Sequence, residues 1–583
     1  MHKHLSVRHL AFVPIITSMI LSARFFITLP IHDYWYALIS SVALQQAGWR
    51  AHLAYYWEPF VDQRMVFPKI MIGGLSRLPY TLHFALEIAF GFAARLAMLY
   101  LLWRLIRQTE GSERNKTIAG LACAFLLFWP LQQVIFQHHW YSTQYAWSLS
   151  PGVLALYLID RFWGRWLGLL AAALACAVGS FSHGTGLPLW PAIGLGLLPQ
   201  RGWSDKQKVV WWLLGLCALA LFLIGLPPRA VRGFPPLLDI LNAPLKGLVF
   251  FFQTFAPPFR WLMKHPYARA AVGTGVVIGG LLPLARLWKN KRLFVPATFP
   301  WLVLILWCLG MAGLAALARS TFEYHARPIY FAGMTLSYVG AISLWLIAAP
   351  RLDADRGQAL PSRRRMTGSL VLICLTLIYL KGANEGWNET RDRYQKVSWA
   401  QSCLQYYPAL DQHDLYVYPY EDHRAFTEFI LPQLAAMNAL PDNMRAAPFT
   451  IPVPTTFVPE RQEGLDIRAA GPSAFQITFA VKDPLVVFKS SPPIPKPCVV
   501  SFELSSSVAT DVIFSWNDGT GWSKAKAVPM DRKGRPVTKH SGYFPEGRQA
   551  DRARPVEAIR LKLTKAEGSP ITVTIQDLKV WIR

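Results

Sequence analysis

The chain has 583 residues, of which 53% are hydrophobic and only 16% charged, and its formal net charge is +25. An ordinary globular chain carries about 25% charged residues, so this composition excludes a conventional water-soluble protein. Residues 1–381 hold 35 Lys and Arg against 12 Asp and Glu, whereas residues 382–583 hold 24 against 22. The basic excess lies between long apolar runs, the pattern of the positive-inside rule, which excludes nucleic acid as the partner.

About eleven apolar runs in residues 1–381 are close to the length needed to cross a bilayer, about 20 residues. The first run is too long for a signal-peptide core and predicts an uncleaved anchor. Every even-numbered connection is basic, which predicts a cytoplasmic N-terminus, an odd number of spans and an extracytoplasmic C-terminus in a bacterial inner membrane. The predicted spans are 10–29, 82–106, 117–137, 142–160, 166–182, 184–199, 209–226, 268–287, 297–317, 328–349 and 367–381.

Two of the outside connections are long. The first loop, 30–81, predicts amphipathic segments lying at the membrane interface, because aromatic residues recur among its apolar ones. The second, 227–266, carries three Pro-Pro pairs and the run Phe250-Phe251-Phe252, which disfavours a continuous helix and places aromatic rings at headgroup depth. The aromatic residues of the first loop include Trp35, Tyr36, Trp49, Tyr55, Tyr56 and Trp57.

The hydrophobic periodicity changes after Lys381. Residues 382–445 predict a mixed helical connector, and residues 446–583 predict an extracytoplasmic β-sandwich, because short runs rich in Val, Ile, Phe and Thr alternate with turn residues. Cys403 and Cys498 both fall after the membrane part, and a disulfide between them is left open because the sequence does not give their geometry. The predicted strands include 474–481, 498–504, 511–516, 558–563 and 571–582.

An aspartate directly after the first predicted span is the first candidate for catalysis. Asp33, in the sequence LPIHDYW, is tethered at the membrane surface, where partial burial raises a carboxyl pKa toward the range of a general base. The alternative is a hydrated loop aspartate without a catalytic role. The acids predicted on the outside are Asp33, Glu58, Asp62, Asp239 and Glu323.

Cations also occur on the predicted outside, where the positive-inside rule does not place them. Arginine can donate two parallel hydrogen bonds to phosphate oxygens, which suits a lipid-phosphate leaving group. The alternative is interfacial anchoring by snorkelling. These cations are Arg64, Lys69, Arg77, Arg319 and Arg327.

Histidines near the outer ends of the predicted helices line a candidate cavity. His183 lies at a Gly-interrupted break between two spans, and such breaks often line cavities. A divalent cation is compatible with three histidines and a carboxylate, but no metal-binding spacing supports one, and the sequence indicates no other cofactor. The candidate cavity-lining residues are His138, His139, His183, Glu323 and His325.

The order of these features resembles the bacterial GT-C superfamily, membrane glycosyltransferases that use polyprenyl-phosphate-linked sugars as donors. The resemblance covers about residues 10–380. It rests on Asp33 after the first span, the long first loop, the block DQRMVFPKI, the segment FSHGTGLPLWP, and ARSTFEYHARPIYF before a late span. The C-terminal domain resembles, by composition, the carbohydrate-binding modules of some related transferases.

The resemblance implies a function and a set of site residues. It implies transfer of a sugar, by inverting displacement, to an extracytoplasmic glycan, lipid or protein, with Asp33 as the catalytic base. The second acid, or acceptor-binding residue, would be Glu58 or Asp62. The residues expected to bind the donor phosphate are Arg64, Lys69, Arg319, Arg327 and Tyr330.

Three other interpretations of the sequence remain open. A transporter or flippase of a lipid-linked sugar is favoured by many spans and by Arg95 and Glu87 inside one of them. An acyltransferase would use His139 or His183. A structural envelope-binding protein would tolerate replacement of the outside acids.

Overall fold

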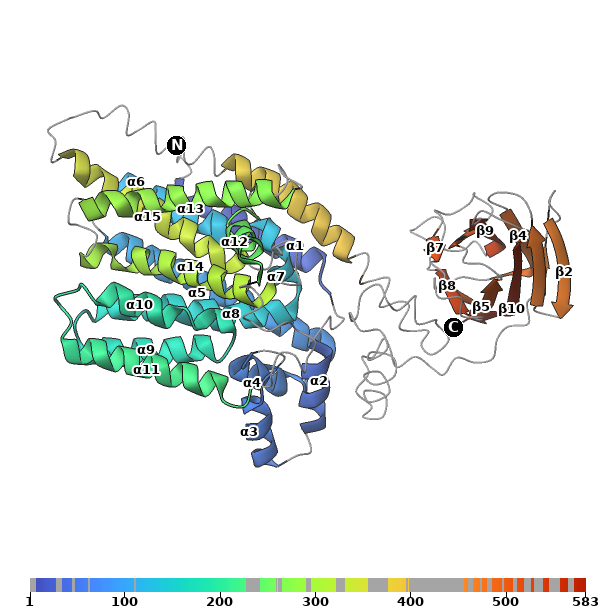
Figure 1. Cartoon of the computed structure of the whole chain (residues 1–583), viewed down its shortest axis with the longest axis horizontal. Coiled ribbons are helices and arrows are strands. Elements are labelled where there is room, and N and C mark those ends of the chain that lie inside the picture. The colour runs from blue at the N-terminus through green and yellow to red at the C-terminus, as the bar shows by residue number, and fades with distance from the viewer. Residues whose placement is uncertain are drawn as a thin grey trace, which may run out of the picture. The chain divides into compact units, whose positions relative to one another are not determined.

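The computed structural model describes most of residues 7–394 and ten strands between residues 456 and 582; the larger undescribed ranges are 28–33, 227–241, 321–330, 355–375 and 401–455. The chain divides into two compact units (Figure 1). The first comprises residues 1–28 and 40–394, and the second residues 29–39 and 395–583. They are described separately below.

The first unit is built almost entirely of helices. A further helix covers residues 376–394. The labelled helices are α1 (Phe12–Arg24), α2 (Tyr34–Ala43), which continues from the second unit, α3 (Trp49–Trp57), α4 (Val66–Leu75), α5 (Tyr80–Gln108), α6 (Glu113–Leu127), α7 (Gln133–Gln137), α8 (His139–Arg161), α9 (Trp166–Ser180), α10 (Leu189–Leu197), α11 (Asp205–Leu223), α12 (Pro244–Gln253), α13 (Pro266–Lys289), α14 (Phe299–Arg319) and α15 (Phe331–Ala354).

Four helices among the described residues, α5, α11, α13 and α14, are long and apolar enough to cross a membrane. Their outer surfaces are also apolar: Leu213, Leu216 and Leu223 on α11 are between 54% and 59% exposed. Leucines exposed in rows on a long helix need lipid rather than water around them. The helical unit is therefore a membrane protein, whereas the predicted number of eleven spans stays a prediction.

The core of this unit lies between α5, α8, α9, α14 and α15. Small residues allow two of these contacts. A Cβ atom on Gly91 of α5 would lie 1.7 Å from Ser142 Oγ of α8, and one on Gly152 of α8 would lie 2.3 Å from the Trp307 ring of α14. Close packing of this kind drives helix association where lipid removes the hydrophobic driving force.

The predicted span 117–137 is interrupted, which corrects the sequence interpretation. Helix α6 ends at Leu127, and a 3-10 turn, Pro130–Gln132, leads into the short α7. Three carbonyls at the end of α6 accept hydrogen bonds from side chains: Gln132 Nε2 donates to Leu126 O (2.8 Å), Arg95 NH1 to Leu127 O (2.9 Å) and Ser18 Oγ to Phe128 O (2.8 Å). Proline removes a donor and breaks the helix, and these side chains replace the lost hydrogen bonds.

The predicted span 184–199 is also shorter than expected. Helix α10 has nine residues, Leu189–Leu197, and at 1.5 Å per residue it is about 14 Å long, too short to cross a bilayer. A 3-10 turn, Gly184–Gly186, precedes it. A Cβ atom on Gly186 would lie 2.3 Å from the Gly179 carbonyl carbon, so only glycine allows the chain to reverse so tightly after α9.

Replacing Arg95 with Met should destabilise the helical unit without changing the affinity for a ligand. Arg95 is 5% exposed, donates to Leu127 O and Gln132 Oε1, and lies over the Phe136 ring at 4.5 Å. Losing the guanidinium leaves buried acceptors unsatisfied, at a cost of about 1–3 kcal/mol each. Thermal unfolding in detergent would measure the loss, and an unchanged midpoint would contradict this structural role.

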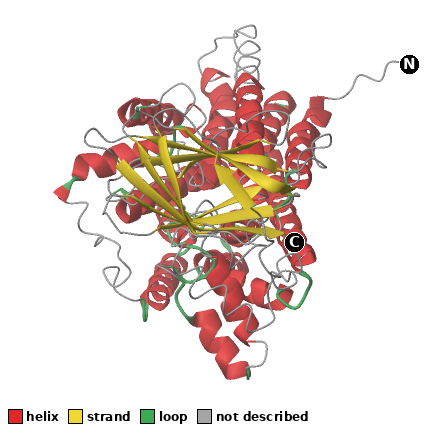
Figure 2. Ribbon diagram, turned by 90° about the vertical axis from the view of Figure 1, so that its right-hand side faces the viewer, coloured by secondary structure: helices red, strands yellow, loops and turns green. Residues whose placement is uncertain are grey.

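The second unit contains two five-stranded antiparallel sheets, with strand orders β1-β4-β9-β6-β7 and β2-β3-β10-β5-β8 (Figure 2). Strands far apart in the sequence pair within each sheet, since β10 lies between β3 and β5. The strands are β1 (Thr456–Pro459), β2 (Leu465–Gly471), β3 (Ala474–Phe479), β4 (Leu485–Ile494), β5 (Cys498–Ser506), β6 (Asp511–Asn517), β7 (Lys526–Val528), β8 (Thr538–Phe544), β9 (Val556–Thr564) and β10 (Ile571–Ile582).

The five strands predicted from the sequence coincide with β3, β5, β6, β9 and β10. The face-to-face packing of a sandwich, and the boundary at residue 446, stay predictions. Cys498 opens β5 opposite Phe544 and Ile582. Cys403 lies outside the described residues, so the open question of a disulfide is not tested.

Candidate functional site

Arg64 is a buried cation between the first loop and a membrane helix. Its side chain is among the largest that are fully buried, with 1% exposure. Nε donates to Phe222 O in the last turn of α11 (2.9 Å), and NH1 donates to Trp57 O at the end of α3. The guanidinium also lies over the Trp57 ring, 4.7 Å from its centroid. The C-terminal ends of two helices therefore provide the oxygen acceptors for this charge.

Lys69, in the first turns of α4, is a second buried cation at the same helix end. It is 1% exposed, and its Nζ donates to Tyr55 O (2.8 Å) and Glu58 O (2.7 Å) at the end of α3. The ammonium lies 4.4 Å from the centre of the Tyr55 ring. The carboxylate of Glu58 is exposed, so this residue contacts Lys69 through its backbone carbonyl.

Arg64 and Lys69, called the paired cations below, are close enough to repel each other. Burial lowers the pKa of Lys69 to about 8; the charge of Glu58 partly opposes this change, and the charge of Arg64 adds to it. Within the described parts of the chain, no carboxylate lies within ion-pair distance of either side chain. Two helix ends supply about one negative charge against two positive charges, so the cluster keeps a net positive potential.

The block that carries the paired cations docks onto the break between α9 and α10. Gly184 N donates to Gln63 Oε1 (3.0 Å), and Val66 N donates to Phe181 O (2.7 Å). The rings of Trp57 and Phe181 pack at 5.5 Å. Two of the three segments that carry the family resemblance, DQRMVFPKI and FSHGTGLPLWP, are therefore in direct contact.

His183 borders the same region, whereas Arg319 lies at the end of α14. His183 Nδ1 lies 2.9 Å from Thr185 Oγ1, which lies 2.6 Å from Ser148 Oγ of α8. The His183 ring packs 5.3 Å from that of Tyr145 of α8. His183 therefore lies between α8 and the segment that contacts the block of Arg64.

The other two predicted site histidines that the structure describes lie in the interior. His139 is 1% exposed and stacks on Phe84 of α5 at 4.2 Å. His83, directly before Phe84, pairs with Glu87 one turn along α5: His83 Nε2 lies 3.4 Å from Glu87 Oε1, and both side chains are fully buried. His138 is 4% exposed, and its ring lies 5.5 Å from that of Tyr141.

Six predicted site residues fall outside the described residues, and their roles are not tested. Sequence reasoning did not find the polar neighbours Tyr145, Ser148 and Thr185. The signal for Tyr145 was the run of polar residues from Ser142 to Tyr145 opening the predicted span 142–160, because polar side chains inside a membrane helix often serve function. The undescribed site residues are Asp33, Asp62, Glu323, His325, Arg327 and Tyr330.

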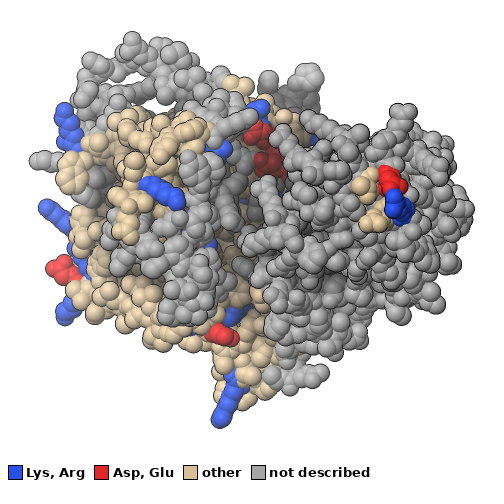
Figure 3. Space-filling model, turned by 45° about the vertical axis from the view of Figure 1, so that its right-hand side comes forward, with Lys and Arg blue, Asp and Glu red and all other residues tan. Residues whose placement is uncertain are grey.

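Among the described residues on the face drawn in Figure 3, most atoms belong to uncharged residues, and the Lys and Arg side chains appear singly. A search of the described residues found no group of three His, Cys, Asp or Glu able to hold a metal ion.

No protein-family model and no curated protein sequence matches the chain. Among solved structures, it is similar to the arabinosyltransferase EmbB from Mycobacterium smegmatis (12% identity, TM-score 0.34, 100% of this chain and 66% of that chain). It is also similar to the oligosaccharyltransferase AglB from Archaeoglobus fulgidus (14% identity, TM-score 0.37, 74% and 60%). A third match, at 14% identity and a TM-score of 0.16, covers 21% of this chain and 93% of a chain described as "CBM4 structure and function". The chain spans less than two thirds of the length of each transferase.

Proposed function

We propose that this protein is a membrane glycosyltransferase of the GT-C superfamily, which transfers a sugar from a polyprenyl-phosphate donor to an extracytoplasmic acceptor. The observation that carries the proposal is the pair of buried cations, Arg64 and Lys69. Burying two like charges side by side is costly unless a counter-charge completes the site. A phosphate diester of a lipid-linked donor supplies that counter-charge, and the membrane helices beside it supply the environment for its lipid chain.

The reaction follows from the chemistry of the donor. The acceptor hydroxyl attacks the anomeric carbon, the bond from that carbon to the phosphate oxygen breaks, and polyprenyl phosphate leaves with the electron pair. Asp33 takes the proton of the acceptor hydroxyl, and the configuration at the anomeric carbon inverts. The cations stabilise the charge that develops on the departing phosphate, which is the usual task of a preorganised cationic site.

The remaining site residues complete this arrangement. Glu58 or Asp62 positions the acceptor, and the aromatic side chains of the first loop stack on sugar. Arg319, Arg327 and Tyr330, at and after the end of α14, bind the donor phosphate together with the paired cations. His138, His139, His183, Glu323 and His325 line the cavity.

The proposed enzyme lies in a bacterial inner membrane with its N-terminus in the cytoplasm. The first loop and the two sheets then face the periplasm, and the sheets form a sandwich that binds carbohydrate. The charge distribution supports this orientation, since every predicted cytoplasmic connection is basic.

A transporter is the second candidate. Arg95, which favoured it in the sequence, is hydrogen-bonded to the end of α6, and Glu87 is paired with His83. Both groups therefore have structural partners in the described core. Purified protein in vesicles, supplied with a labelled polyprenyl-phosphate sugar and an envelope extract, separates the two functions. We expect label covalently attached to an acceptor; label moved across the bilayer without a covalent product would overturn the proposal.

Donor affinity should fall as the pH rises above about 8. Lys69 has its pKa lowered to about 8 in the free protein, chiefly by burial, and a bound phosphate would raise this pKa again. Binding then takes up a proton above pH 8, and kcat/KM should decline by about tenfold per pH unit until the raised pKa is reached. The Lys69→Arg variant keeps its charge and should lose this decline. An identical slope in both proteins would exclude Lys69 as its source.

A further inference from the structure

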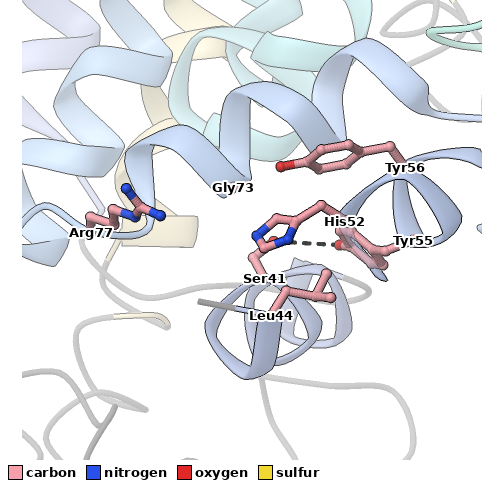
Figure 4. Close-up of a pocket in the computed structure, with 7 residues that line it drawn as sticks. All are labelled: Ser41, Leu44, His52, Tyr55, Tyr56, Gly73 and Arg77. Carbon is pink, nitrogen blue, oxygen red and sulfur yellow. Dashed lines mark hydrogen bonds between the residues drawn. The ribbon is translucent and has the colours of Figure 1, made fainter. Parts of the chain in front are cut away.

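The helical unit contains an apolar groove lined by α13, α14 and α15, in which α15 packs against both of the other helices (Figure 1). Its volume is about 320 Å³, within the range of ligand pockets. By contrast, the small pocket around Arg77 among α2, α3 and α4 (Figure 4) has only about 10 Å³, which is room for about one water molecule. A ligand of more than a few atoms therefore fits the groove but not the pocket.

The lining of the groove presents hydrocarbon. None of the described residues that line it is charged. The Tyr338 hydroxyl donates to Phe255 O, and Trp345 Nε1 donates to Gly279 O (3.2 Å). The third polar side chain, Ser337, bonds to a carbonyl of its own helix. Because water needs two or more polar partners in a cavity, this lining favours an apolar occupant.

The groove lies at the depth of lipid chains. On α15 it runs from Ser337 to Trp345, about 9 and 21 Å from the start of the helix at 1.5 Å per residue. On α13 it ends at Leu281, about 22 Å from the start of that helix. The hydrocarbon layer of a bilayer is about 30 Å thick, so the groove lies near its middle. Ile278 and Leu282, beside the groove on α13, are 54% and 46% exposed, which places lipid at its open side.

We propose that the groove binds one acyl chain of a membrane phospholipid, which fills the space between α13 and α14. Val276 and Val277 line it from α13, and Ile305 and Leu309 line it from α14. An apolar cavity of about 150 Å³ holds benzene, so by proportion this groove holds about a dozen carbon atoms. That is close to one acyl chain and well short of a polyprenyl chain. An empty groove would leave these side chains without dispersion contacts on one side.

The surroundings favour a phospholipid over a rarer lipid. Phospholipid chains form the medium around α13 and α14, both of which are long and apolar enough to cross a membrane. An uncharged lining selects no headgroup, so the most abundant chain should occupy the groove by mass action. This assignment does not depend on the proposed transferase activity.

Two glycines of α13 provide a geometric test. Gly279 lines the groove, and Gly275, one turn earlier, is not among the lining residues. A Cβ atom on either glycine would meet nothing within 4 Å. Gly279→Leu therefore places a side chain in the groove without displacing a neighbour, and Gly275→Leu is its matched control. Both replacements raise helix propensity, so both variants should fold.

A phospholipid with a diazirine near the end of one acyl chain, photolysed with the full-length protein in nanodiscs, reports which residues the chain contacts. Peptide mass spectrometry should find at least about threefold more crosslinking at Leu309 than at Leu213 or Leu216, although these α11 leucines are more exposed. Gly279→Leu should lower the crosslinking at Leu309 by about fivefold, and Gly275→Leu by less than about twofold.

Two results of the crosslinking would overturn the assignment. Equal crosslinking at Leu309 and the α11 leucines, or no change in Gly279→Leu, would mean contact with bulk lipid only. Loss of the crosslinks when polyprenyl phosphate is added in an equimolar amount would assign the groove to that chain instead. We expect polyprenyl phosphate to lower them by less than about twofold.

Thermal unfolding in detergent gives a second measurement. Added phospholipid should raise the unfolding midpoint of the wild type and of Gly275→Leu, because it binds the folded groove. The rise should be about half as large in Gly279→Leu, whose groove is already filled. Equal rises in the two variants would count against the groove. Because sugar transfer is not the readout, failure of this proposal is distinguishable from failure of the proposed function.

Discussion

Replacing Asp33 with Asn should reduce sugar transfer by about 10²- to 10⁴-fold, the usual contribution of a general base. The amide is nearly isosteric with the carboxylate but cannot take the proton from the acceptor hydroxyl. Binding of the polyprenyl-phosphate donor should change by less than about twofold, because the paired cations remain. Steady-state transfer and equilibrium donor binding on the same purified variant would measure the two effects.

The matched control for this variant is Asp239→Asn, which makes the same replacement in the other long connection predicted outside the membrane. It should retain transfer within about twofold, as expected for an acid with no assigned role. Substantial transfer by the Asp33→Asn protein would remove Asp33 as the base. Equal losses in both variants would instead indicate a general effect of lowering the negative charge outside.

The sequence predicted the location of the membrane helices better than their ends. Apolar length is a local property, and α5, α11, α13 and α14 each overlap a predicted run but extend two to four residues beyond it at one end or both. The break after α6 depends on donors that are remote in the chain, because Ser18 and Arg95 lie about 110 and 32 positions from the carbonyls that they bond. Hydropathy does not report such partners, and a continuous span was predicted.

The strands show the same division between local and non-local information. Strands β5 and β10 are runs of β-branched and aromatic residues, and both were predicted. Strand β4 contains Pro492-Pro493, which argues against a central strand. The structure accommodates the prolines because pairing of β4 with β9 is interrupted between Lys489 and Ile494.

In the candidate site, the sequence identified the residue types but not their surroundings. Arg64 and Lys69 were predicted as phosphate ligands from their position outside the membrane. Their burial, and their hydrogen bonds to the ends of α3 and α11, depend on tertiary packing that no spacing in the sequence encodes. The pocket around Arg77 was not predicted, because its side chains become neighbours only when α2, α3 and α4 pack together.

Replacing Arg64 with Met should both destabilise the protein and raise the KM for the donor by at least about tenfold. The stability loss has the same origin as in Arg95→Met, since each arginine is buried, donates to two oxygen acceptors and lies over an aromatic ring, Trp57 or Phe136. Unsatisfied buried acceptors cost about 1–3 kcal/mol each in both variants. Only Arg64 is close to Lys69, so only its removal should weaken the positive potential at the paired cations.

The comparison of the two arginine variants therefore separates folding from function. At a temperature where both are folded, Arg95→Met should keep the wild-type KM for the donor, while Arg64→Met should not. Arg64→Lys keeps the positive charge but loses the two parallel N–H donors of the guanidinium, so it should recover only part of the donor affinity. In the Arg64→Met/Lys69→Met protein, the loss of donor binding free energy should be smaller than the sum of the losses in the two single variants, because both cations would act on one phosphate. Equal KM values for Arg64→Met and Arg95→Met would mean that the paired cations only stabilise the ends of helices and do not bind the donor. The proposed donor site would then have to lie elsewhere.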